Sequence, residues 1–180
     1  GSVDLGFFYY ILAAVFIVGM VNAVNFTDGI DGLNTSVTLV VALVFSVIAM
    51  LLNRVGLSLY AAAIVGAMIG FLFWNANPAK VFMGDTGSLF LGGAVCALAF
   101  GVDMPILLIL IGIIYIVEIL SVVLQVTYFK ISHGKRIFKM APIHHHFEMC
   151  GWNENKICFV FSGVTLFAGI IGVLLAVFGC

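Results

Sequence analysis

Polar side chains recur at every third position in one short segment, at Asn25, Asp28 and Asp31. Residues three apart share a face of a helix, so this spacing would bring two carboxylates together. Like charges that share a site need a cation or a hydrogen-bond donor between them. The segment therefore predicts a binding site for a cation or a polar ligand. A glycine-rich helix end followed by a cap at Asn34 or Thr35 is the alternative, and it would explain only part of the pattern.

A second polar segment, residues 75–88, contains Asp85 at the point where an apolar run begins. Aspartate is a good N-cap residue, which would be a purely structural role. A helix start also attracts anions, and a carboxylate there can hold Mg²⁺ that is shared with substrate phosphates. Phe82, in the same segment, would stack against a flat ring if it is exposed. A Walker A nucleotide site is excluded, because the segment has no Gly-Lys-Ser or Gly-Lys-Thr.

The third feature is a run of three histidines, His144, His145 and His146, after a basic stretch from Lys130 to Lys139. Consecutive residues point in different directions on either a helix or a strand, so the three side chains are not expected to bind one metal ion together. Imidazoles donate hydrogen bonds to phosphate oxygens and titrate near neutral pH. We expect the histidines to lie in an active site that binds anionic ligands, and contact with lipid headgroups is the alternative.

Two further polar residues, Glu118 and Gln125, interrupt an otherwise apolar stretch. A carboxylate at membrane depth is costly and by default marks a functional site. A buried hydrogen bond between helices would account for Glu118 equally well. Gln125 lies nearer to the basic stretch, and so nearer to the other polar segments.

These polar residues stand out because the chain has few of them. Of the 180 residues, 64% are apolar and only 8% are charged, with a net charge of −1. This composition excludes a disordered chain, which needs low hydrophobicity and high charge. It also argues against nucleic acid as a partner, because the basic excess is absent. A soluble domain has about 25% charged residues, so the chain is expected to lie in a lipid bilayer, where a span takes about 20 apolar residues.

Six apolar runs separate the polar segments, and they determine the expected fold. Helices are predicted throughout, because a lone strand would leave its backbone unpaired in lipid and the runs lack the alternation of a membrane barrel. The prediction is an all-α fold, a polytopic membrane helical bundle of about six transmembrane helices that takes up residues 1–180 as one unit. The expected spans are 6–24, 34–52, 57–74, 87–101, 105–127 and 157–179.

The loops of such a bundle have a charge bias that predicts its orientation. With six spans, both termini lie on one side, and the loops 25–33, 75–86 and 128–156 lie on the other. These three loops carry Lys80, Lys130, Lys135, Arg136, Lys139 and Lys156, whereas the opposite side has only Arg54. The positive-inside rule makes the three-loop side cytoplasmic. The three polar clusters fall in these loops, so a site that faces the cytoplasm is expected at the membrane boundary.

The polar segments resemble those of one known family. The matching stretches are NAVNFTDGIDGL at 22–33, NANPAKVFMGDTGSLFLGG at 75–93, VEILSVVLQV at 117–126 and APIHHHFE at 141–148. In order and spacing they resemble the MraY branch, the phospho-N-acetylmuramoyl-pentapeptide transferases, of the polyprenyl-phosphate N-acetylhexosamine-1-phosphate transferase family. The first two stretches are similar to the wider family, and the histidine run points to this branch.

The resemblance implies a Mg²⁺-dependent membrane enzyme of peptidoglycan biosynthesis. Such enzymes transfer phospho-MurNAc-pentapeptide from UDP-MurNAc-pentapeptide to undecaprenyl phosphate, which gives lipid I and UMP. The implied location is the bacterial cytoplasmic membrane, and the implied assembly is a homodimer. The resemblance makes Asp85 the metal ligand and puts Asp28, His144, His145 and His146 at the catalytic centre. The implied substrate-binding residues are Asn25, Gly29, Ile30, Asp31, Asn75, Phe82 and Gln125, with Phe82 against the uracil ring.

One difference from the family is large. Its members are longer, with further spans on the N-terminal side that carry an adjacent pair of aspartates, and no two aspartates are adjacent in this sequence. We therefore expect this chain to be the C-terminal part of such an enzyme. The N-terminal half would be a required partner, and the 180 residues alone are expected to be inactive.

Several alternatives stay open from the sequence. A sister transferase that acts on UDP-GlcNAc or UDP-GalNAc would share the first two stretches. A transporter would spread its polar residues through the spans rather than gather them at one boundary, and a membrane scaffold would not need three polar segments on one side. For the reaction, in-line attack by the lipid phosphate is the first hypothesis, and a two-step route with Asp28 as covalent nucleophile is the second.

Overall fold

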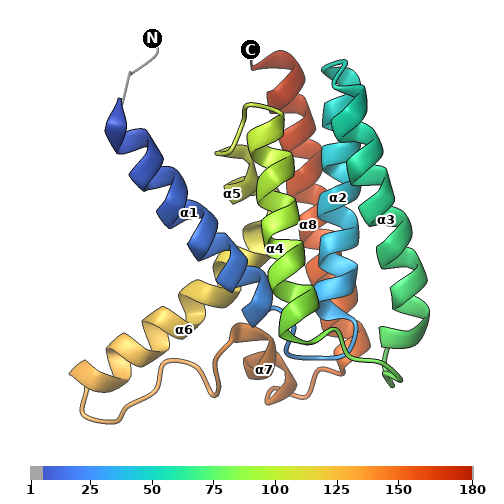
Figure 1. Ribbon diagram of the computed structural model, residues 1–180. Coiled ribbons are helices and arrows are strands. Elements are labelled where there is room, and N and C mark those ends of the chain that lie inside the picture. Colours follow the sequence, from blue (N-terminus) through green and yellow to red (C-terminus); the bar gives the residue numbers. More distant parts are fainter. Residues whose placement is uncertain (1–5, 180) are drawn as a thin grey trace.

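Long helices make up most of the described chain. The computed structural model describes residues 6–179, which contain eight helices and no strand (Figure 1). The helices are α1 (Phe7–Phe26), α2 (Leu33–Leu51), α3 (Val55–Asn75), α4 (Gly84–Gly101), α5 (Leu107–Ile111), α6 (Ile113–Ile131), α7 (Ile143–Glu148) and α8 (Glu154–Phe178). Six of them, α1, α2, α3, α4, α6 and α8, are long and apolar enough to cross a membrane. The predicted all-α, multi-pass membrane fold is confirmed.

The fifth apolar run differs from its prediction. We expected one span over 105–127, but the helix breaks at Gly112 into the short α5 and the longer α6. α5 packs beside α8, whereas α6 is strongly inclined to it (Figure 1). A Cβ at Gly112 would lie 2.7 Å from the carbonyl oxygen of Leu108, so this bend requires glycine. Hydropathy identified the apolar run but carries no signal for such a change of direction.

α2 lies at the centre of the bundle and packs against both α3 and α8 (Figure 1). Its buried residues include Val41, Phe45 and Ile48, which follow the three- and four-residue spacing of one helix face. Helices in lipid associate through close packing, because lipid tails are as apolar as the helices themselves. α1 and α4 show such packing, since a Cβ at Gly92 would lie 2.6 Å from the Cα of Val21.

The connecting segments that carry the polar residues gather at one end of the bundle. The turn 27–32, the loop 76–83 and the segment 132–153, which contains α7, all lie there, whereas α8 ends at the opposite end (Figure 1). Three segments that are far apart in the sequence therefore share one end, as the six-span arrangement predicted. That this end faces the cytoplasm stays a prediction.

Candidate active site

A hydrogen bond joins Asn25, in the last turn of α1, to Asp85, in the first turn of α4. The amide Nδ2 of Asn25 donates to Oδ1 of Asp85 at 3.1 Å and to Oγ of Ser88 at 2.8 Å. α4 begins at Gly84, whose φ of 67° is a conformation that favours glycine. This start puts the carboxylate of Asp85 at the N-terminal end of the helix, where the helix dipole stabilises negative charge.

Asp28 lies in the turn after α1, close to the same carboxylate. The pKa of Asp28 is raised to about 6, mainly because the carboxyl is partly buried, and the nearby charge of Asp85 acts in the same direction. Hydrogen bonds from the Asn34 side chain and the Gly84 N–H act against this rise in the pKa. The two carboxylates thus repel each other, and a cation between them would relieve the repulsion.

The oxygen atoms available as metal ligands here fit magnesium better than zinc. Mg²⁺ binds through one or two carboxylates, keeps several water molecules and shares other positions with substrate phosphates. Zinc sites usually have three or more protein ligands, most often histidine and cysteine. Within residues 6–179, no group of three or more His, Cys, Asp or Glu side chains is placed to hold a metal ion. Asp28 and Asp85, with the amide of Asn25 beside them, are the residues that could hold Mg²⁺.

Asp31 connects three segments of the chain. Its Oδ2 accepts a hydrogen bond from the Ala79 N–H at 2.8 Å and another from the Asn77 amide at 3.4 Å. Its own N–H donates to Oε2 of Glu154 at 2.9 Å. Asp31 therefore ties the turn 27–32 to the loop after α3 and to the start of α8.

The expectation that Asn25, Asp28 and Asp31 share one helix face is wrong. α1 ends at Phe26 and the chain continues as turns, so the three-residue spacing no longer follows a helix. Asp28 interacts with the start of α4, whereas Asp31 interacts with the loop after α3. Between them, Ile30 is partly buried and packs against the hydrophobic core.

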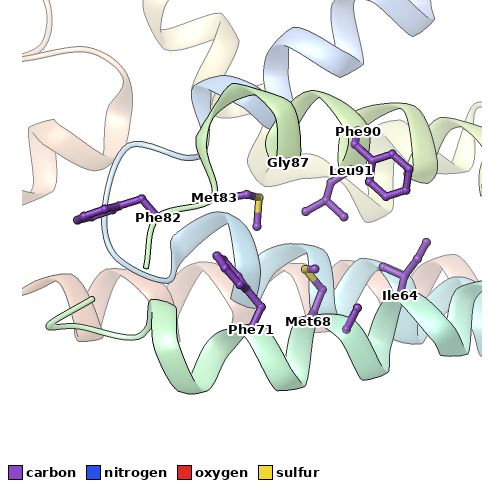
Figure 2. A pocket seen from close by; sticks show the side chains of 9 residues that line it. Ile64, Met68, Phe71, Phe82, Met83, Gly87, Phe90 and Leu91 are labelled. Carbon is purple, nitrogen blue, oxygen red and sulfur yellow. The ribbon is translucent and has the colours of Figure 1, made fainter. Parts of the chain in front are cut away.

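Phe82 meets the condition for stacking against a flat ring, because it is exposed, with 74% of its surface accessible. It lies at one end of an apolar groove of about 400 Å³ between α3 and α4 (Figure 2). Asn75, at the end of α3, is buried: its Oδ1 accepts from Oγ1 of Thr35 at 2.5 Å, and its Nδ2 donates to the Val81 carbonyl at 3.0 Å. Asn75 therefore fixes the loop that carries Phe82.

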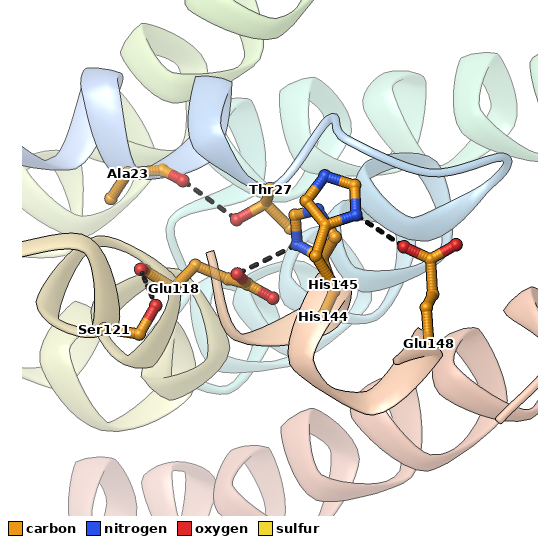
Figure 3. A network of polar contacts seen from close by, with 7 residues as sticks. All are labelled: Ala23, Thr27, Glu118, Ser121, His144, His145 and Glu148. Carbon is orange, nitrogen blue, oxygen red and sulfur yellow. Dashed lines mark hydrogen bonds and ion pairs between the residues drawn. The ribbon is translucent and has the colours of Figure 1, made fainter. Parts of the chain in front are cut away.

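Two of the three histidines pair with different glutamates (Figure 3). His144 is completely buried, and its Nδ1 lies 2.9 Å from Oε2 of Glu118 on α6. His145 is partly exposed, and its Nδ1 lies 2.5 Å from Oε2 of Glu148 at the end of α7. Of these two imidazoles, only that of His145 has surface that a ligand could reach.

His146 and Gln125 hold the long loop before α7. Nδ1 of His146 accepts a hydrogen bond from the Lys139 N–H at 3.1 Å. Oε1 of Gln125 accepts from the N–H groups of Ile137 and Phe138 at 3.1 and 2.9 Å, and its amide Nε2 donates to the Phe138 carbonyl at 3.1 Å. The three imidazoles thus contact three different groups: Glu118, Glu148 and the Lys139 N–H.

Gly29 brings the turn of Asp28 against His144. A Cβ at Gly29 would overlap the imidazole ring at Nε2 and Cε1, so this approach needs glycine. The ring centroids of His144 and His145 are 4.2 Å apart. The structure therefore joins the Asp28 turn to α4 on one side and to the histidine helix on the other.

Four residues that the sequence analysis did not place in the site complete these connections. They are Asn34, Ser88, Glu118 and Glu154. Glu118 had a signal, as a carboxylate in an apolar run, and the buried hydrogen bond was one of its two open interpretations. Asn34 and Glu154 resemble ordinary residues of helix starts, so their bonds across loops were not visible in the sequence.

Known proteins match this chain along most of its length. The model of glycosyl transferase family 4 matches residues 1–103. A phospho-N-acetylmuramoyl-pentapeptide-transferase of Clostridium perfringens (strain SM101) is 55% identical over 166 residues, which are 92% of this chain and 51% of that protein. Proteins of the same name from Clostridium botulinum (strain Eklund 17B) and Listeria monocytogenes (serotype 4b, strain CLIP80459) are 52% and 49% identical. These two matches cover 95% and 98% of this chain, and 52% and 55% of the respective relatives. The chain therefore spans about half the length of the curated relatives it matches.

Proposed function

The chain belongs to glycosyl transferase family 4, and we propose that it is the C-terminal part of a phospho-N-acetylmuramoyl-pentapeptide transferase. The proposed reaction moves phospho-MurNAc-pentapeptide from UDP-MurNAc-pentapeptide to undecaprenyl phosphate, with lipid I and UMP as products. Relatives of that name that are 49–55% identical over nearly the whole chain support this proposal. The observation that carries it is the meeting of Asp28, Asp85 and the histidine helix α7 at one end of the bundle.

Magnesium is the proposed cofactor, with Asp28 and Asp85 as its protein ligands. When bound, it would offset the negative charge of the donor pyrophosphate and the acceptor phosphate. The amide of Asn25 orients the carboxylate of Asp85. The side chain of Asn34 and the N–H of Gly84 orient the carboxylate of Asp28. Both carboxylates are thus held in place by neutral donors, which leaves their charge available to a cation.

For the reaction we favour a single in-line displacement. A phosphate oxygen of the lipid acceptor forms a bond to the phosphorus that carries the sugar, and the bond from that phosphorus to the bridging oxygen breaks. The electron pair of the broken bond leaves with UMP. A two-step route would need Asp28 as the nucleophile. Its burial, its two hydrogen bonds and its proximity to Asp85 support a role as a fixed ligand instead.

The donor nucleotide is proposed to bind at the exposed loop next to this pair. Phe82 offers a flat apolar surface for the uracil ring. Asp31 and Asn75 hold the loop that carries it, and Gly29 and Ile30 lie in the turn that Asp31 ties to this loop.

The other catalytic and substrate-binding residues lie on and around α7. His145 has exposed surface from which it could donate to a phosphate oxygen. His144 is buried, whereas His146 and Gln125 are partly exposed like His145, and all three support the segment around α7 through hydrogen bonds within the protein.

The acceptor lipid has a candidate surface on the other side of the site. A groove of about 390 Å³ runs along α6, with an apolar wall that includes Val122 and Phe129 and with Lys130 and Arg136 at its edge. Cations beside an apolar groove suit a phosphate on a long hydrocarbon chain. We propose that this end of the bundle faces the cytoplasm from the bacterial cytoplasmic membrane. The N-terminal half of the same enzyme and a second copy of it are the proposed protein partners.

The test is turnover by the intact protein that carries this chain, purified in detergent and supplied with Mg²⁺ and undecaprenyl phosphate. Release of UMP and formation of lipid I from UDP-MurNAc-pentapeptide would support the proposal. Turnover of UDP-GlcNAc or UDP-GalNAc instead would identify a sister transferase. No turnover of any of the three donors would overturn the transferase function. Residues 1–180 alone should be inactive, because the adjacent aspartate pair of the family is absent from them.

A further inference from the structure

A buried pair of polar side chains lies behind the turn that carries Asp28. Glu118 on α6 and His144 on α7 have no exposed surface, and Oε2 and Nδ1 are 2.9 Å apart (Figure 3). The other atom of each group, Oε1 of Glu118 and Nε2 of His144, has no hydrogen-bond partner within the described residues. Buried polar atoms without partners are costly, and a buried ion pair is weak grounds for stability. The pair therefore calls for a role other than holding the fold together.

The unpaired nitrogen of His144 lies directly against Gly29. A Cβ at Gly29 would overlap Nε2 of the imidazole ring. Gly29 is not among the glycines with positive φ in residues 6–179, so its own backbone does not require glycine. The neighbouring ring is the reason that a larger residue does not fit there. Contact with His144 thus sets how close the turn comes to α7.

We propose that Glu118 is a positioning residue that holds the imidazole of His144 against Gly29 and thereby fixes the turn that presents Asp28 to Asp85. A carboxylate accepts hydrogen bonds, so pairing with Glu118 keeps a proton on Nδ1 and sets the orientation of the ring. The inference rests on the proposed function, because that function assigns the turn to the active site. Three segments take part: α6, α7 and the turn after α1.

This support acts on one half of the turn only. Asp31, on the other half, is held separately by the Ala79 N–H and by Glu154. Since His144 has no exposed surface, it supports the turn from inside the protein and does not touch a substrate. Loss of the pair should therefore disturb the metal-binding side of the site more than the side that holds the nucleotide.

The first experiment compares Glu118→Gln with Thr165→Val in the intact protein. Both positions are buried, and the hydroxyl of Thr165 donates to the Phe161 carbonyl within α8, so its substitution is a matched control for loss of a buried polar group. Glu118→Gln should lower kcat about 10- to 100-fold, as expected for a misplaced reacting group, and should change KM for the nucleotide donor less than about threefold. Thr165→Val should leave both constants unchanged. A rise in KM with an unchanged kcat would overturn the inference.

The second experiment measures the local stability of the turn 27–32 directly and does not depend on enzyme activity. Amide hydrogen exchange of the turn 27–32 should become faster in Glu118→Gln and in His144→Ala, whereas exchange within α2 should stay as in the wild type. Gly29→Ala should also accelerate exchange in this turn, but it should add nothing in the His144→Ala background, because the ring that its Cβ would strike is gone. Unchanged exchange in Glu118→Gln, or additive effects of the two other changes, would overturn the inference even if the transferase activity is confirmed. Accelerated exchange in a protein that proves to catalyse another reaction would support the positioning role and remove the proposed function.

Discussion

Replacing Gly92 with alanine should disturb the active site through helix packing alone. The added Cβ would lie 2.6 Å from the Cα of Val21, about 0.8 Å inside the 3.4 Å at which ordinary contact begins. The atom that it meets belongs to the backbone, so no side chain can rotate away and α1 must move from α4. Overpacking of this kind costs about 1–3 kcal/mol.

The displacement reaches the site because the contacts follow the same helix faces. Asn25 lies one turn after Val21, and Ser88 lies one turn before Gly92. The hydrogen bond from Asn25 to Asp85 is already 3.1 Å long, so a further displacement of most of an ångström would break it. A misplacement of about 1 Å can lower a rate on the order of 100-fold. We expect turnover of Gly92→Ala to fall between about 10- and 100-fold.

Gly93 supplies the matched control. A Cβ at Gly93 would meet nothing within 4 Å, so alanine fits there without strain. Alanine is more favourable than glycine inside a helix by about 1 kcal/mol, so Gly93→Ala should raise the thermal midpoint slightly and keep wild-type turnover. Thermal unfolding in detergent and steady-state release of UMP measure the two variants side by side. Equal midpoints and equal turnover for Gly92→Ala and Gly93→Ala would refute the close contact between α1 and α4.

Three further outcomes follow from the same site. Asp85→Ala should lower UMP release about 1,000-fold at every Mg²⁺ concentration, and recovery at high Mg²⁺ would show that another residue is the main ligand. Phe82→Ala should raise KM for the nucleotide donor up to about tenfold with kcat kept, whereas Phe90→Ala, at an exposed aromatic on the same groove, should leave KM unchanged. The pKa of Asp28 is raised from 3.8 to about 6 in the folded protein, so the stabilisation that its proton gives below pH 4 is lost as the pH rises to 6. In metal-free protein, the free energy of unfolding of the wild type should therefore fall by about 2 kcal/mol relative to that of Asp28→Asn between pH 4 and pH 6, after allowance for solvent screening, and should fall no further above pH 6. Chemical denaturation of the two proteins at a series of pH values measures this difference, and parallel curves of stability against pH would contradict the prediction.

Hydropathy predicted the six membrane helices because each contains a long apolar run, whatever its neighbours are. The bend at Gly112 was missed for the opposite reason. It depends on the close approach of one glycine to the Leu108 carbonyl and on the packing of α5 against α8. These contacts are set by tertiary structure, and the apolar run reads the same on both sides of the bend.

The candidate site was predictable to the extent that it depends on which side of the membrane each loop lies. That reasoning put Asp28, Asp85 and the histidines at one end, and the structure joins these segments there. It gave no partner for any side chain. The burial of His144 against Glu118, like the hydrogen bonds of Gln125 to the loop before α7, depends on how the irregular loop 132–142 places the short α7 against α6. Irregular segments have no periodicity from which such contacts could be predicted.

Asp28 and Asp31, both in the turn 27–32, have different partners because of where α1 ends, and their substitutions can be compared. Because α1 stops at Phe26, Asp28 meets a second carboxylate, whereas Asp31 accepts hydrogen bonds from the Ala79 N–H and the Asn77 amide. Asparagine keeps a carbonyl oxygen that can accept from the same N–H, but it brings no charge for a cation. Asp31→Asn should therefore lower turnover less than about tenfold, and Asp28→Asn about 100-fold or more, because only the second removes a charge from the metal site. Steady-state UMP release measures both, and equal losses would mean that the two carboxylates bind the same cation after all.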